Sequence, residues 1–127
     1  MKTSILVLLL ASFTFIACQD VPASVRDISQ EEFVASPPVG ALILDVRSEE
    51  EFAKGHVPNA ILIPHDELAA RVSELGSDTG RPVVVYCESG KRAGMAGTTL
   101  LEAGFTDVAH LDGDMRGWRE SGRPTEQ

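Results

Sequence analysis

The segment with the greatest capacity for chemistry is the run CESGKR at residues 87–92. It directly follows an apolar run at residues 83–86, which is typical of a buried strand, and it begins a helical pattern. In parallel α/β sheets, ligands bind at the carboxyl ends of the strands, where this loop would lie. Converging backbone N–H groups, the helix dipole and the positive charges of Lys91 and Arg92 would all favour a thiolate. Cys87 is therefore the candidate nucleophile.

The three residues that follow Cys87 have separate predicted roles. Gly90 allows a tight backbone turn that a side chain would obstruct. Ser89 either donates a hydrogen bond to the sulfur or caps the following helix, and the sequence leaves both roles open. Glu88 opposes a thiolate unless its side chain points to solvent. An inert cysteine buried at a strand end is the alternative, but the glycine and the two cations at a helix start favour the functional interpretation.

The elements that must position this loop follow an alternating pattern. Short apolar runs alternate with helical patterns from residue 25 onward, which predicts a parallel sheet covered by helices on both faces. Ser29 and Ser48 each precede a glutamate by three residues, the spacing of a capping box at a helix start. Strands are expected at residues 25–28, 41–46, 60–63, 83–86 and 108–111, and helices from Ser29, from Ser48 and at residues 68–75, 92–103 and 115–120.

Two charged residues at the end of the second expected strand are candidates for supporting the site. Asp45 is expected at the same edge of the sheet as Cys87, where it either accepts backbone hydrogen bonds from the active loop or has a purely structural role. Arg47 precedes Glu51 by four residues, a spacing that predicts a structural ion pair between them.

The segment at residues 1–17 has the layout of a signal peptide. Lys2 is the only charge before Asp20, and residues 5–10 are entirely apolar. Cys18 follows a small residue, as in a bacterial lipobox, so we expect it to be acylated and to anchor the protein to a membrane. Ordinary cleavage nearby, or an uncleaved anchor, are the alternatives. The predicted division is a signal peptide at 1–17, a tether at 18–24 and one domain at 25–127, exported to the periplasm or cell envelope.

Composition excludes several classes of function. The formal net charge of -8 argues against nucleic acid, because phosphate binding needs a basic surface. The chain has only two cysteines, and its three histidines are scattered without ligand spacing, so no metal site is expected. An acylated Cys18 would leave Cys87 without a disulfide partner, and a lone thiol in an oxidising compartment is a liability unless it is buried or used.

Three stretches, in order and at domain spacing, resemble the signatures of the rhodanese family. The resemblance covers nearly all of residues 25–124 and implies a three-layer α/β fold, with a five-stranded parallel sheet flanked by helices. The first stretch comprises residues 45–47, 51–52, 55–60 and 63–64, the second is the loop at 87–92, and the third comprises 111–115, Trp118 and 122–124.

The resemblance implies a sulfurtransferase that works by a ping-pong mechanism. Cys87 would take the outer sulfur of a donor such as thiosulfate or polysulfide, and a thiol, cyanide or a protein acceptor would remove it. The loop amides and Arg92 would hold the anionic sulfur, and neither a metal nor an organic cofactor is implied. Related phosphatases have a loop one residue longer, so the loop length favours sulfur over phosphate.

Two departures from the family pattern have consequences. Glu88 stands where many sulfurtransferases have arginine, which puts thiosulfate as the natural donor in doubt. A sulfur carrier without turnover on free small molecules, or a protein-binding module, is therefore the alternative function. Asp114 replaces a glycine common in the third signature, and an aspartate can tolerate an unusual backbone angle there.

Overall fold

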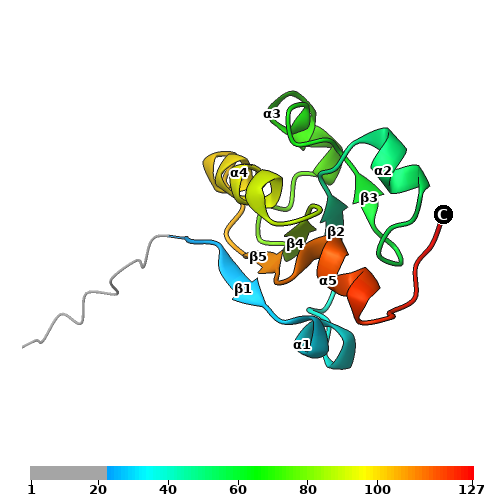
Figure 1. Cartoon of the computed structure of the whole chain (residues 1–127). Coiled ribbons are helices and arrows are strands. Elements are labelled where there is room, and N and C mark those ends of the chain that lie inside the picture. The colour runs from blue at the N-terminus through cyan, green and yellow to red at the C-terminus, as the bar shows by residue number, and fades with distance from the viewer. Residues whose placement is uncertain (1–22) are drawn as a thin grey trace, which may run out of the picture.

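A parallel five-stranded sheet organises residues 23–127, the part of the chain that the computed structural model describes (Figure 1). The strand order is β1-β5-β4-β2-β3, and every pairing is parallel, as the predicted α/β fold requires. The strands are β1 (Arg26–Ile28), β2 (Leu42–Asp45), β3 (Ile61–Leu62), β4 (Val83–Tyr86) and β5 (Val108–Leu111).

The central strand is β4, and its sequence accounts for its place. All four of its residues are buried, and three of them are valines, whose β-branched side chains suit a strand covered on both faces. The strand pairs with β2 along its whole length, where Val83 lies opposite Leu42 and Tyr86 opposite Asp45. The residue that follows this strand, Cys87, therefore emerges from the middle of the sheet.

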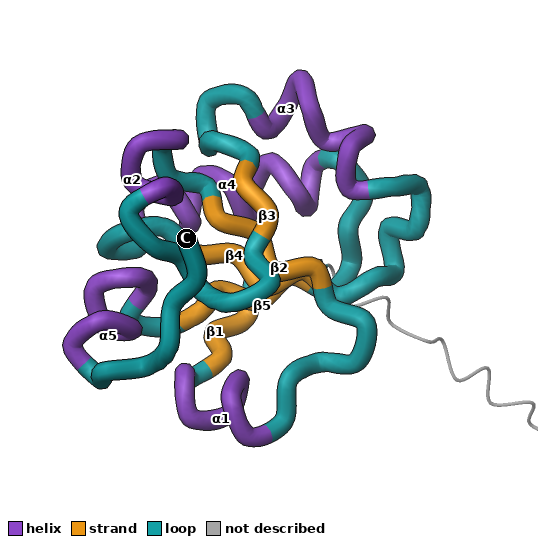
Figure 2. Tube along the Cα trace, turned by 90° about the vertical axis from the view of Figure 1, so that its right-hand side faces the viewer, coloured by secondary structure: helices purple, strands orange, loops and turns teal. Residues whose placement is uncertain are grey.

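Helices cover both faces of the sheet, which gives three layers (Figure 2). One apolar cluster packs α3 (Leu68–Arg71), the 3-10 helix η1 (Val72–Leu75) and α4 (Lys91–Glu102) against the sheet. The other packs α1 (Gln30–Ala35) and α5 (Asp114–Glu120) against the opposite face. The remaining helix, α2 (Glu49–Ala53), buries no residue and follows the carboxyl end of β2.

Local signals fix the helix ends that frame the site. Ser48 and Glu51 form the complete predicted capping box at the start of α2. Ser29 accepts a hydrogen bond from the backbone of Glu32 at 3.1 Å, which is one half of the expected box. At the end of α4, the N–H groups of Gly104 and Phe105 donate to the carbonyls of Leu101 and Leu100, the pattern of a Schellman motif.

The helix predicted at residues 68–75 is divided. Its first turn is α3, and the second tightens into η1, which ends at Gly76 with φ 88°. The residue before α3, Glu67, provides no side-chain cap, so this short segment has little to stabilise a regular helix. The predicted signal peptide, Cys18 and most of the tether lie outside the described residues. Within residues 23–127 no helix is long and apolar enough to cross a membrane.

Candidate active site

The loop after β4 folds back onto the sulfur of Cys87. The backbone N–H of Gly90 donates a hydrogen bond to Cys87 Sγ at 3.0 Å. Gly90 is the N-cap of α4 and has φ 110°, a conformation that a residue with a side chain rarely adopts. Cys87 itself is only 1% exposed. The sequence predicted several converging amides, and the structure places one, that of Gly90, at the sulfur, directly before the first turn of α4.

The sequence did not predict that Asp114 would support this loop. Its Oδ1 accepts a hydrogen bond from the backbone N–H of Cys87 at 3.0 Å, and its side chain is buried. Asp114 has φ 56°, the unusual backbone angle expected at this position. The next residue, Met115, donates its backbone N–H to the carbonyl of Cys87 at 2.9 Å. The start of α5 therefore holds both backbone polar groups of the cysteine.

A histidine provides the counter-charge of this buried carboxylate. His110 Nε2 lies 3.0 Å from both carboxylate oxygens of Asp114, and His110 Nδ1 lies 3.0 Å from Asp27 Oδ1. The hydrogen bond to Asp114, together with Asp27, raises the pKa of His110 to about 9. At neutral pH the imidazolium therefore balances the negative charge that Asp114 places behind the thiol.

Asp45 and Arg47 form a buried structural pair beside the loop. The carboxylate of Asp45 accepts hydrogen bonds from the backbone N–H and the guanidinium of Arg47, at 2.8–3.1 Å. It also accepts one from the hydroxyl of Tyr86 at 2.6 Å, and burial and this carboxylate raise the Tyr86 pKa. The predicted pairing of Arg47 with Glu51 is wrong, because Asp45 lies closer and Arg47 Nη2 binds the Gly55 carbonyl instead.

Arg92 engages the glutamate that was expected to bind Arg47. Its two Nη atoms donate to the two carboxylate oxygens of Glu51 at 2.7 and 3.0 Å. This fork, together with the Ser48 cap, lowers the pKa of Glu51 to about 2. The side chains of Lys91 and Ser89 are exposed, and the cap position of α4 belongs to Gly90 rather than Ser89. The guanidinium of Arg92 thus faces a carboxylate at the loop's rim.

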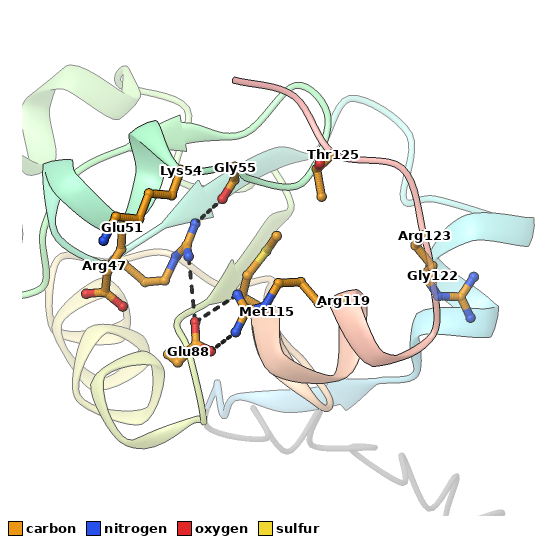
Figure 3. A pocket seen from close by; sticks show the side chains of 10 residues that line it. All are labelled: Arg47, Glu51, Lys54, Gly55, Glu88, Met115, Arg119, Gly122, Arg123 and Thr125. Atoms are coloured by element: carbon orange, nitrogen blue, oxygen red, sulfur yellow. Dashed lines mark hydrogen bonds and ion pairs between the residues drawn. The ribbon is translucent and has the colours of Figure 1, made fainter.

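Glu88 points toward two arginines, one on α5 and one in the turn between β2 and α2 (Figure 3). Arg119 on α5 donates to both of its carboxylate oxygens, and Arg47 Nη1 lies 3.7 Å from its Oε2. Its charge is therefore partly neutralised, which was not expected from the sequence. These three side chains line a pocket of about 620 Å³, together with Glu51, Lys54, Gly55, Met115, Gly122, Arg123 and Thr125.

This arrangement suits a thiolate nucleophile. The carboxyl end of a central strand presents the thiol, an amide donates to its sulfur, and ion pairs fix the surrounding side chains. Within residues 23–127 no three His, Cys, Asp or Glu side chains gather as ligands for a metal ion. The geometry provides for nucleophilic attack and for stabilising negative charge on sulfur.

Comparison with known proteins identifies the family. The model of the rhodanese-like domain matches residues 24–121, which includes the whole sheet and the Cys87 loop. The chain belongs to the rhodanese-like family. This membership agrees with the resemblance that the three sequence signatures indicated.

Relatives of this rhodanese-like domain include sulfurtransferases. A sulfurtransferase of Allochromatium vinosum is 36% identical over 83 residues, which cover 65% of this chain and 76% of the relative. The thiosulfate sulfurtransferase GlpE of Pseudomonas syringae is 32% identical over 94 residues, covering 74% and 87%. A solved rhodanese-related protein of Thermoplasma volcanium superposes with a TM-score of 0.70 at 28% identity, covering 80% of this chain and 97% of that one.

Proposed function

We propose that this rhodanese-like domain is a sulfurtransferase that carries sulfane sulfur as a persulfide on Cys87. The observation that carries the proposal is the hydrogen bond from the Gly90 amide to Cys87 Sγ, at 3.0 Å. An amide donor at the N-terminus of α4 stabilises negative charge on sulfur, which favours a nucleophilic thiolate and then an anionic persulfide. The sulfurtransferases among its relatives support the same chemistry.

The proposed reaction has two half-reactions. In the first, the Cys87 thiolate attacks the outer sulfur of the donor, the donor's sulfur–sulfur bond breaks, and its remainder leaves with the bonding electrons. With thiosulfate the leaving group is sulfite, and with an organic persulfide it is a thiolate. In the second, a thiolate or cyanide attacks the outer sulfur of the Cys87 persulfide, and Cys87 leaves as the thiolate. Atoms and electrons balance without an external oxidant or reductant.

The neighbouring residues have supporting roles in this scheme. Asp114 fixes the position of the Cys87 amide, and the His110 imidazolium offsets the carboxylate's charge. Arg92 and Glu51 form an ion pair that ties α4 to α2 across the loop. In this proposal the pair fixes the shape of the rim, while the loop amides contact the transferred sulfur.

Mass spectrometry of the domain after incubation with thiosulfate or polysulfide, without reductant, tests the proposal. We expect a gain of one sulfur, about 32 Da, that maps to Cys87 and disappears when a thiol acceptor or cyanide is added. The Cys87→Ser variant should keep its fold, checked by circular dichroism, and gain no sulfur. A Cys87 that stays a plain thiol with both donors would remove the proposed chemistry.

A sulfur carrier that works within a protein complex is the second candidate. It is favoured by the burial of Cys87, which is 1% exposed and so offers little direct access to free small molecules. The acidic net charge of -8 would also repel small anionic donors at long range. Steady-state turnover with thiosulfate and cyanide separates the two. A domain that loads sulfur once, but turns over poorly with free acceptors, would be a carrier.

We further propose that the domain works outside the cytoplasm, attached through a lipid on Cys18. The support is the sequence alone: an apolar run at residues 5–10, one early positive charge, and a small residue before the cysteine. Fractionation of cells that express the full chain tests this attachment.

A further inference from the structure

We infer that Glu88, through its ion pair with Arg119, makes this site select organic persulfides over thiosulfate as the sulfur donor. The inference rests on the proposed sulfur transfer and concerns which class of donor loads Cys87. An organic persulfide carries at most one negative charge at its reacting end, whereas thiosulfate is a compact dianion. The ion pair between Glu88 and Arg119 determines how much of the arginine's positive charge remains available to bind such a dianion.

The contacts of Glu88 offset the positive charge of two arginines that line the pocket beside the loop. Both carboxylate oxygens accept hydrogen bonds from Arg119, which raises the pKa of that arginine. The other nearby guanidinium, that of Arg47, is already bound by Asp45 and approaches Glu88 at 3.7 Å. In Figure 3, dashed lines join the Glu88 carboxylate to both arginines. The two guanidinium groups, of Arg47 and Arg119, are therefore matched by two carboxylates, those of Asp45 and Glu88.

Two further cations around the pocket and the loop are also paired with carboxylates. Arg92 donates both Nη atoms to Glu51, and Lys54 lies 3.2 Å from Glu50. A dianion that bound to Arg47, Arg92 or Arg119 would have to displace a carboxylate from that guanidinium. A donor with one negative charge or none meets a smaller electrostatic barrier.

The shape of the pocket points to the same class of donor. Its volume of about 620 Å³ is far larger than thiosulfate requires, and it lies in the range of pockets for small organic ligands. Its lining includes the apolar side chain of Met115 and the small residues Gly55, Gly122 and Thr125. Glu88, which directly follows Cys87 in the chain, also lines this pocket, so the pocket offers room for the organic part of a persulfide beside the active loop.

The reaction that this inference favours is the loading of Cys87 with sulfur from an organic persulfide. The Cys87 thiolate attacks the outer sulfur of R–S–SH, the bond between the two donor sulfurs breaks, and R–S⁻ leaves. The products are the Cys87 persulfide and a free thiolate, so one negative charge enters the step and one leaves. No other reactant is required.

The test compares the rates at which Cys87 gains sulfur from thiosulfate and from cysteine persulfide, measured by quenched-flow mass spectrometry. In Glu88→Gln the guanidinium of Arg119 is freed, and the ratio of the thiosulfate rate to the persulfide rate should rise on the order of tenfold. In the double variant Glu88→Gln/Arg119→Gln most of that gain should disappear. Added salt should reduce the gain, because it arises from charge.

Glu102→Gln is the matched control, since it removes the same charge from an exposed position on α4 that does not line the pocket. The ratio of the thiosulfate rate to the persulfide rate in Glu102→Gln should equal the ratio in the wild type. If Glu88→Gln leaves the ratio unchanged, or if Glu102→Gln raises it equally, the inference about Glu88 is overturned while sulfur transfer stands. If Cys87 gains sulfur from neither donor in any variant, the proposed function fails and the inference falls with it.

Discussion

The ion pair beneath the active loop should make the stability of the domain depend on pH through one histidine. His110 has a folded pKa of about 9 against an ordinary value of 6.5, chiefly because of its hydrogen bond to Asp114. A histidine with a raised pKa contributes its full stabilisation below its ordinary pKa, and this is lost as the pH rises through the folded value. Asp114→Asn keeps an oxygen for the Cys87 amide but removes the charge.

The size of the effect follows from the pKa shift. At about 1.4 kcal/mol for each pKa unit, the shift of His110 sets a ceiling of roughly 3 kcal/mol. Asp27 provides part of the shift, and the His110 side chain is 20% exposed. That exposure weakens the pair through solvent screening. We therefore expect Asp114→Asn to lower the free energy of unfolding by about 1–2 kcal/mol near pH 6.

Urea unfolding of the two proteins at about pH 6, 8 and 10, in a Cys87→Ser background, measures this difference. The background removes the reactive thiol from the comparison. The difference in the free energy of unfolding between the parent and Asp114→Asn should be largest near pH 6 and shrink toward pH 10. In the variant, NMR titration should show the His110 pKa moving back toward 6.5. If this difference stays constant over the pH range, the ion pair between His110 and Asp114 is not its cause, and the reasoning is refuted.

Three further outcomes are expected. In Gly97→Ala the added Cβ would lie 2.8 Å from the Val25 side chain, whereas in Gly94→Ala, on the same helix, it meets nothing within 4 Å. Urea unfolding should therefore show Gly97→Ala destabilising by about 1–3 kcal/mol and Gly94→Ala stabilising by about 0.5–1 kcal/mol. In Gly90→Ala the residue has φ +110 and its Cβ would lie 3.2 Å from a carboxylate oxygen of Asp114. This variant should load sulfur more slowly by mass spectrometry and lose about 1–2 kcal/mol of stability, the usual cost of a left-handed backbone for a residue with a side chain. Cys18→Ser should move the protein from the membrane to the soluble fraction of fractionated cells; unchanged fractionation would contradict lipidation.

The sheet and its loop could be predicted because their signals are local. The valines of β4 mark a strand buried on both faces, and Gly90 marks the turn that follows it. The Ser48 capping box depends on residues only three apart, so its sequence pattern was sufficient. Predictions of this kind do not depend on which distant residues contact the segment in the folded protein.

The partners of the charged residues could not be predicted, because they join distant parts of the chain. Arg92 and Glu51 are 41 residues apart, and Asp114 follows Cys87 by 27. The prediction for Arg47 used the four-residue spacing of helical ion pairs, but Arg47 precedes α2 and turns back to the end of β2. Tertiary arrangement, rather than spacing, decided each pair.

The parallel direction of all strands also determines which way the reactive loop faces. Residue 23 precedes the amino end of β1, whereas Cys87 follows the carboxyl end of β4, so the two lie at opposite ends of the sheet. If Cys18 is the membrane anchor, a tether at residues 18–24 reaches at most about 25 Å. The bilayer would then face the amino end of the sheet, and the loop that carries Cys87 would face the surrounding fluid. Such a protein would meet dissolved donors or proteins from the aqueous side, rather than partners embedded in its own membrane.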